Sequence, residues 1–167
     1  MGQDKALLSW KGQPLLLHMR QLLLDAGARH VVLSGHHAGY GAISDLTAGA
    51  GPMAALAQLA PQLEDRPWIV VPVDMPHLHP SLIHALLRES GPCVSVRDHP
   101  LPMCLRIDAS TRSAIAGIGM KTGRDCSLRA LHDALSGRFL DEDPWRDQLA
   151  NCNTPEQWAA LRSSSDA

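Results

Sequence analysis

The chain has 167 residues, which is the length of one domain. Hydrophobic residues make up 45% and charged residues 19%, so a disordered or fibrous chain is excluded. With 15 basic and 17 acidic side chains the net charge is -2, which gives no electrostatic reason to expect nucleic acid binding. No apolar run approaches the roughly 20 residues that span a bilayer, and no signal peptide is recognisable. We therefore expect a cytoplasmic protein without membrane association.

Proline and glycine residues divide the chain into alternating helical and extended segments. A helix with one apolar stripe is predicted from Pro14 to Gly27, followed by a short buried strand over 31–33. The remaining predicted elements, in chain order, are a helix over 52–63, a strand over 68–71, a helix over 80–87, strands over 93–96 and 103–107, a helix around 115–118, a helix over 127–135 and a helix from Thr154 onward. This alternation predicts a single α/β domain over residues 1–167, in three layers, with a mostly parallel sheet between helices.

The cysteines agree with a protein of a reducing compartment. They include no CxxC pair, so neither a zinc knuckle nor a redox dithiol is indicated. We expect buried free thiols at all of them: Cys93, Cys104, Cys126 and Cys152.

Two charged residues are candidates for a functional site. Asp74 follows the predicted strand 68–71, and ligands of open α/β sheets bind at the carboxyl ends of the strands. Its carboxylate is suited to hold Mg²⁺ against phosphate oxygens, or alternatively to cap the turn before Pro76. Lys5 follows a glycine closely and is either a phosphate-binding cation or a solvated surface lysine.

Several other site patterns are absent or incomplete in the sequence. It contains no GxxxxGK[ST], GxGxxG or GxSxG motif, which excludes a P-loop and gives no support to a dinucleotide site or a hydrolase elbow. The histidine pairs have no Cys or carboxylate partners at ligand spacing. We interpret them as loop or surface residues rather than as metal ligands: His36, His37, His77 and His79.

Four motifs together resemble those of a known family. In chain order they are MGQDKALL, GPMAALAQL, VPVDMPHL and NCNTPEQW. Their order and spacing resemble RMGxDKxLL, GPLxGL, PCDxPxL and NxNTPEDL of the molybdenum cofactor guanylyltransferases, and the resemblance runs from residue 1 to about residue 161. It implies a Rossmann-like nucleotidyltransferase fold and transfer of GMP from Mg-GTP to molybdopterin, with release of pyrophosphate. It also implies Mg²⁺ as cofactor, GTP and molybdopterin as binding partners, and contacts with molybdopterin-biosynthesis proteins or molybdoenzyme chaperones.

The resemblance also assigns roles to individual residues. It makes Lys5 and Asp74 the catalytic pair, with Lys5 binding phosphate and Asp74 ligating Mg²⁺. It places Ser34 where the family often has a nucleoside-contacting asparagine, and Asp45 at an acidic nucleotide-contact position. The paired asparagines beside the family's site are matched by Asn151 and Asn153, which we expect near the molybdopterin.

The chain differs from the family pattern at its start. The family begins with an apolar strand and a loop of the type LAGGxSxR, and this chain begins at the MG that follows them. We expect the natural protein to begin about 15 residues earlier, and a chain without that strand to be marginally stable and poorly active. Two alternatives remain open: a molybdenum cofactor cytidylyltransferase that uses CTP, and a non-catalytic module that binds nucleotide or a partner protein.

Overall fold

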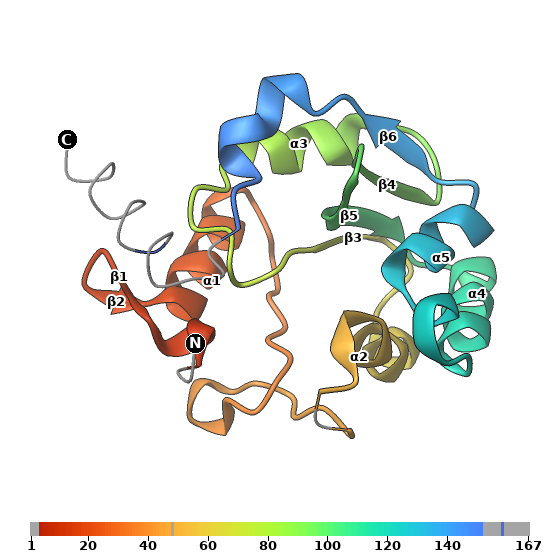
Figure 1. Cartoon of the computed structure of the whole chain (residues 1–167), viewed down its shortest axis with the longest axis horizontal. Coiled ribbons are helices and arrows are strands. Elements are labelled where there is room, and N and C mark those ends of the chain that lie inside the picture. The colour runs from red at the N-terminus through yellow and green to blue at the C-terminus, as the bar shows by residue number, and fades with distance from the viewer. Residues whose placement is uncertain (1–3, 48, 152–157, 159–167) are drawn as a thin grey trace. The chain divides into compact units, whose positions relative to one another are not determined.

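The computed structural model, drawn in Figure 1, describes residues 4–47, 49–151 and 158. The chain divides into two compact units. The first unit comprises Met1–Val31, Val71–His84 and Asp141–Ala167. The second unit comprises Val32–Val70 and Ala85–Leu140. The expectation of one domain over residues 1–167 stays a prediction. No helix among the described residues is long and apolar enough to cross a membrane.

The first unit is built around a small hairpin and one helix. A 3-10 turn, η1 (Lys5–Leu7), leads into the antiparallel strands β1 (Ser9–Trp10) and β2 (Gln13–Pro14), and these lead into α1 (Leu15–Asp25). The unit also holds the start of α3 (Pro80–Arg88) and the 3-10 helix η5 (Asp143–Gln148).

Helix α1 confirms the prediction made from its apolar stripe and its glycine. Leu15, Met19 and Leu22 are buried and recur on one face of the helix. At the other end, Gly27 has a φ of 93°, which a glycine adopts without steric cost. The N–H of Ala28 donates to the Leu23 carbonyl at 3.0 Å, which satisfies an open carbonyl of the last turn and ends the helix as a Schellman motif.

A four-stranded sheet forms the centre of the second unit. Its strands, in spatial order, are β3 (Pro67–Val70), β5 (His99–Arg106), β4 (Cys93–Val96) and β6 (Arg138–Leu140). The helices of this unit are α2 (Gly51–Leu59), α4 (Ala109–Gly119) and α5 (Leu128–Ala134), with the 3-10 turns η2 (Ala38–Tyr40), η3 (Ala60–Gln62) and η4 (Gly123–Asp125). One apolar core joins α2, α4 and α5 to β4 and β5 through buried side chains that include Met53, Met103, Leu105, Ile115 and Leu131.

The α/β class is confirmed, but the sheet of the described residues is mixed rather than mostly parallel. Strand β5 runs antiparallel to both of its neighbours, β3 and β4, and only β4 and β6 are parallel. The reason lies in the connection between β4 and β5, which is a tight turn in which Asp98 has a φ of 63°. Two strands joined by so short a turn can pair only in the antiparallel direction.

The remaining differences from the predicted elements concern short or extended segments. Residues 31–33 do not form a strand; this segment ends in an isolated parallel bridge between Ser34 and Ile43. Strand β5 begins at His99 rather than at residue 103, and β6 was not predicted because its three residues carry too little periodic signal. The predicted helix from Thr154 falls outside the described residues, apart from Trp158.

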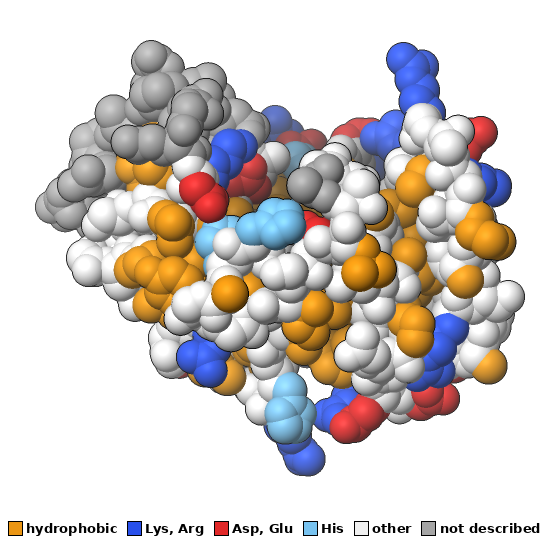
Figure 2. Space-filling model, turned by 90° about the horizontal axis from the view of Figure 1, so that it is seen from below, with side chains coloured by type: hydrophobic (Ala, Val, Ile, Leu, Met, Phe, Trp, Pro, Cys, Tyr) orange, Lys and Arg blue, Asp and Glu red, His pale blue; other side chains and the backbone are white. Residues whose placement is uncertain are grey.

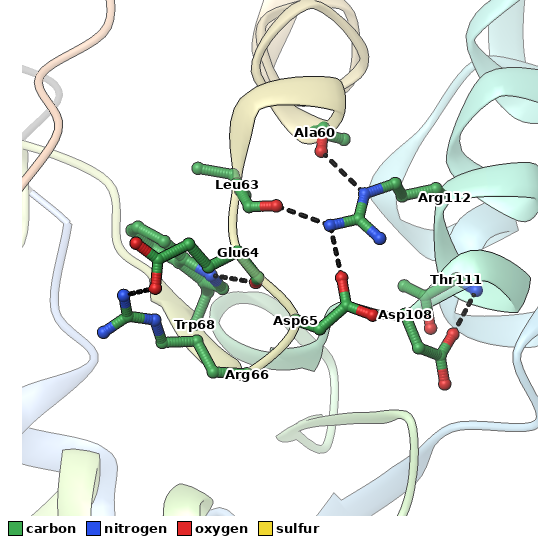
Figure 3. Close-up of polar contacts among 9 residues, drawn as sticks. All are labelled: Ala60, Leu63, Glu64, Asp65, Arg66, Trp68, Asp108, Thr111 and Arg112. Carbon is green, nitrogen blue, oxygen red and sulfur yellow. Dashed lines mark hydrogen bonds and ion pairs between the residues drawn. The ribbon is translucent and has the colours of Figure 1, made fainter.

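A polar junction holds the connection between α2 and β3 (Figure 3). Arg112, from α4, donates to the carbonyl oxygens of Ala60 and Leu63 and pairs with Asp65 at 2.7 Å. At the start of α4, the Asp108 carboxylate accepts from the Thr111 N–H at 2.7 Å. This hydrogen bond is the main cause that lowers the pKa of Asp108. The connection into β3 is therefore fixed by side chains rather than left as a loose loop.

Three of the four cysteines lie among the described residues, and all three are free thiols. Cys93 and Cys104 are buried as expected, and burial raises the pKa of Cys93 to about 12. Cys126 is only half-buried, and Cys152 lies outside the described residues. The thiolate form of Cys93 is thus disfavoured, which agrees with a packing role for this side chain.

Candidate functional site

The structure brings Lys5 and Asp74 into direct contact within the first unit. Lys5 begins η1, whose backbone is capped by Asp4 through the N–H of Ala6 at 3.0 Å. The Lys5 ammonium donates to Oδ2 of Asp74 at 3.2 Å. The turn that follows Asp74 is closed by the backbone, with the Leu78 N–H on the Met75 carbonyl at 3.1 Å. Lys5 is therefore not an isolated surface lysine.

This ion pair remains accessible to a ligand. The Lys5 side chain is 33% exposed and that of Asp74 is 20% exposed. An ion pair with this much exposure contributes only about 0–1 kcal/mol to stability. Breaking the pair so that a phosphate group can bind the Lys5 ammonium therefore costs little free energy. The carboxylate is then free to bind a cation. The arrangement is suited to a phosphate group that arrives with a metal ion.

Aromatic side chains hold the segment that carries Asp74. Nε2 of His18, on α1, is hydrogen-bonded to the Pro76 carbonyl at 3.1 Å. The Trp10 ring meets the edge of His77 with the ring centroids 5.4 Å apart. Burial lowers the pKa of both histidines, since a partly desolvated ring is costly to charge. Neither Trp10 nor His18 could be singled out from the sequence, because their contacts are with residues distant in the chain.

The predicted asparagines are placed only in part. Asn151 is exposed, and Asn153 lies outside the described residues. The segment before Asn151 is fixed by Gln148, whose Oε1 accepts from the His79 N–H at 3.1 Å, next to the start of α3. No group of three or more His, Cys, Asp or Glu residues in the described part of the chain is arranged to hold a metal ion.

In the second unit, the structure brings together two residues that were predicted separately, Ser34 and Asp45. The Ser34 hydroxyl donates to Oδ1 of Asp45 at 2.8 Å. The two segments are joined by backbone hydrogen bonds: the Ile43 N–H donates to the Leu33 carbonyl at 2.8 Å, and the Gly35 N–H to the Ile43 carbonyl at 3.0 Å. Ser34 is exposed and Asp45 is half-buried, so the carboxylate can meet a ligand. The two pairs belong to different units.

Figure 2 shows the charged side chains on one face of the molecule. Its lysine and arginine side chains lie at separate places, in several cases beside acidic side chains, rather than in one basic patch. Asp74 follows a sheet strand, where ligands of open α/β sheets bind, and a carboxylate there beside a lysine is suited to hold a phosphate group together with a metal ion.

The chain belongs to the MobA-like NTP transferase domain family, which matches residues 1–135. It is therefore a nucleotidyltransferase. It is 46% identical over 164 residues to a molybdenum cofactor guanylyltransferase of Xanthomonas euvesicatoria, covering 96% of this chain and 87% of that protein. It is 30% identical over 179 residues to the protein of the same name from Pseudomonas aeruginosa, covering 96% and 87%. The resemblance drawn from the four motifs is confirmed.

Solved structures support the nucleotidyltransferase fold. Molybdopterin-guanine dinucleotide biosynthesis protein A of Archaeoglobus fulgidus has a TM-score of 0.75 at 16% identity, over 99% of this chain and 92% of that one. The 2-C-methyl-D-erythritol 4-phosphate cytidylyltransferase of Thermus thermophilus has a TM-score of 0.71 at 19% identity, over 98% and 94%. At these identities the likeness concerns the fold alone. The expected Rossmann-like fold is confirmed.

Proposed function

We propose that this chain transfers GMP from GTP to molybdopterin and releases pyrophosphate, with Lys5 and Asp74 as its catalytic pair. The observation that carries the proposal is the contact of 3.2 Å between these two side chains. It joins the first and third motifs of the chain, and a relative that is 46% identical is named molybdenum cofactor guanylyltransferase. The proposal includes the assignment of Ser34 and Asp45 to the nucleoside, and of Asn151 and Asn153 to the molybdopterin.

The proposed reaction requires no covalent bond between the protein and the substrates. A phosphate oxygen of molybdopterin attacks the α-phosphorus of GTP in line, a new phosphorus–oxygen bond forms, and the bond to the β-phosphate oxygen breaks. Because the attacking phosphate is already an anion, no general base is required. The Lys5 ammonium, with three donors, stabilises the charge that develops on the non-bridging and leaving oxygens. Lys5 thus exchanges a carboxylate partner for a phosphate partner on binding.

Asp74 is the residue that would hold Mg²⁺. A magnesium ion that binds nucleotide usually retains several waters and takes one or two carboxylates besides the phosphate oxygens. A single accessible carboxylate fits this requirement, and the described residues hold no larger group of metal ligands. When bound, the ion neutralises phosphate charge and polarises the phosphorus–oxygen bonds. Asp74 orients that charge toward the triphosphate.

Turnover with GTP and with CTP tests the proposal directly. The purified chain is supplied with molybdopterin, Mg²⁺ and either nucleotide, and pyrophosphate release is measured. We expect release with GTP and at least about tenfold less with CTP, since a pocket that pairs its polar groups with one base leaves them unpaired with another. A preference for CTP identifies a cytidylyltransferase instead. Calorimetric binding of Mg-GTP without any pyrophosphate release identifies a binding module.

A further inference from the structure

Gln58 of α2 makes two hydrogen bonds to the chain on either side of Asp45. Its Nε2 donates to the Ser44 carbonyl at 2.9 Å, and its Oε1 accepts from the Leu46 N–H at 2.9 Å. One side chain therefore holds the backbone immediately before and immediately after the acidic residue. An amide suits this position, since one partner is an acceptor and the other is a donor.

The segment around Asp45 has little other support from packing. The Leu46 side chain is 86% exposed, and Ser44 is exposed as well. Helix α2, in contrast, is anchored in the core of the second unit by Met53 and Leu56, which are 2% and 5% exposed. The hydrogen bonds of Gln58 thus attach the exposed segment around Asp45 to helix α2, which is itself held by the core.

We infer that Gln58 is a positioning residue for nucleotide recognition. It fixes the backbone around Asp45, and the Ser34 hydroxyl orients the Asp45 carboxylate at 2.8 Å. The carboxylate is therefore in its binding position before the nucleoside arrives. The inference rests on the proposed contact of Asp45 with the nucleoside. Its physical basis is preorganisation, because a segment that is ordered before binding loses less conformational entropy when the ligand arrives. Gln58 itself does not touch the reacting atoms.

Gln58→Met tests the inference, since methionine keeps the length of the side chain and removes both hydrogen bonds. We expect the Kd for Mg-GTP, measured by calorimetry, to rise about three- to tenfold, as the loss of one or two hydrogen bonds predicts. We expect kcat at saturating GTP to stay within about twofold, because uniform binding is lost rather than transition-state stabilisation. The control is Gln62→Met, at an exposed glutamine of η3, which leaves both values unchanged.

The double variant Asp45→Ala/Gln58→Met separates positioning from a general effect on α2. If Gln58 acts through Asp45, its substitution adds nothing to the loss caused by Asp45→Ala alone. An undiminished effect of Gln58→Met in the Asp45→Ala background overturns the inference, and so does an unchanged Kd in Gln58→Met when Asp45→Ala weakens binding. If Asp45→Ala alone leaves the Kd unchanged, the proposed nucleoside contact has failed and the positioning role fails with it.

Hydrogen exchange provides a readout that does not depend on activity. The Leu46 amide, bonded to Gln58 in the native chain, is expected to exchange faster in Gln58→Met and at the native rate in Gln62→Met. Should Gln58→Met fail to fold, Gln58→Glu replaces it, since a carboxylate keeps the acceptor for Leu46 and loses the donor for Ser44. Native exchange at Leu46 in a folded Gln58→Met overturns the inference.

Discussion

The ammonium of Lys5 lies 3.2 Å from Oδ2 of Asp74, although the two residues stand 69 positions apart in the chain. One comes from a 3-10 turn near the start of the chain and the other from the segment after β3. Each residue alone is a weak sequence signal, and the contact supports the proposal that Lys5 binds phosphate and Asp74 a metal ion. The first two predictions concern this pair.

Asp74→Asn is expected to lower Mg²⁺-dependent pyrophosphate release by at least about 100-fold. The neutral amide binds the metal ion weakly, so the ion no longer stabilises the charge that develops on the phosphate oxygens. The fold should persist, since an ion pair that is only partly buried contributes little to stability. Steady-state kinetics over a range of Mg²⁺ concentrations and a thermal melt make the measurement. Undiminished turnover at saturating Mg²⁺ would place the metal ligand elsewhere.

Lys5→Gln removes the positive charge and keeps a hydrogen-bond donor at nearly the same reach. Turnover with GTP should fall at least about tenfold, since the amide cannot neutralise charge on the leaving oxygens. Lys121→Gln is the matched control, because Lys121 is exposed and belongs to the other unit. Equal activity of the two variants would contradict the role of Lys5.

Gly137→Ala should destabilise the second unit by roughly 1–3 kcal/mol through overpacking. A Cβ at this position comes within 2.5 Å of Nε2 of His132. That ring cannot yield easily, because it stacks on Phe139 and bonds the Arg138 carbonyl at 3.1 Å. Chemical denaturation measures the change in the free energy of unfolding.

Gly117→Ala serves as the control for that substitution. A Cβ at Gly117 meets no atom within 4 Å, and the residue lies inside α4. The change should be neutral or stabilise the protein by up to about 1 kcal/mol through helix propensity. Similar unfolding free energies for the two variants would show that the contact with His132 is relieved at no cost.

His77→Phe should reduce the loss of stability in mild acid. Burial, the largest cause, lowers the pKa of His77 below its usual 6.5, and the nearby Lys11 adds to this while Asp147 opposes it. A folded pKa below the unfolded one means that the stabilising contribution is present above about pH 6.5 and is lost as the pH falls. Nε2 of His77 is also buried without a partner, so the substitution should stabilise the protein by up to about 1 kcal/mol.

Thermal melts at pH 8 and pH 5.5 measure this effect. The drop in Tm between the two pH values is expected to be smaller in His77→Phe than in the native chain. His30→Phe, at an exposed histidine of the same unit, should keep the native drop. An identical drop in all three proteins would assign the acid sensitivity to other groups, of which His18 is the first candidate because burial lowers its pKa as well.

The sequence by itself determined the features that depend on neighbours within a few residues. The apolar stripe of α1, its end at Gly27 and the start of α5 after Ser127 all appear where the local pattern predicts them. A helix forms its hydrogen bonds and its apolar face within its own segment, so its signals are local. The four motifs likewise indicated the family from the sequence alone, because each is a short run of residues.

Only the tertiary structure decided which strands and which side chains contact one another. A strand takes its hydrogen-bond partners from distant parts of the chain, so the mixed direction of β5 and the existence of β6 could not be predicted from the apolar runs alone. The same holds for the contacts of Asp45 with Ser34 and for the two hydrogen bonds of Gln58 beside it. The motifs identified Lys5 and Asp74 as candidates, whereas only the folding of the chain brought their side chains within 3.2 Å of each other, because the two residues lie 69 positions apart in the sequence.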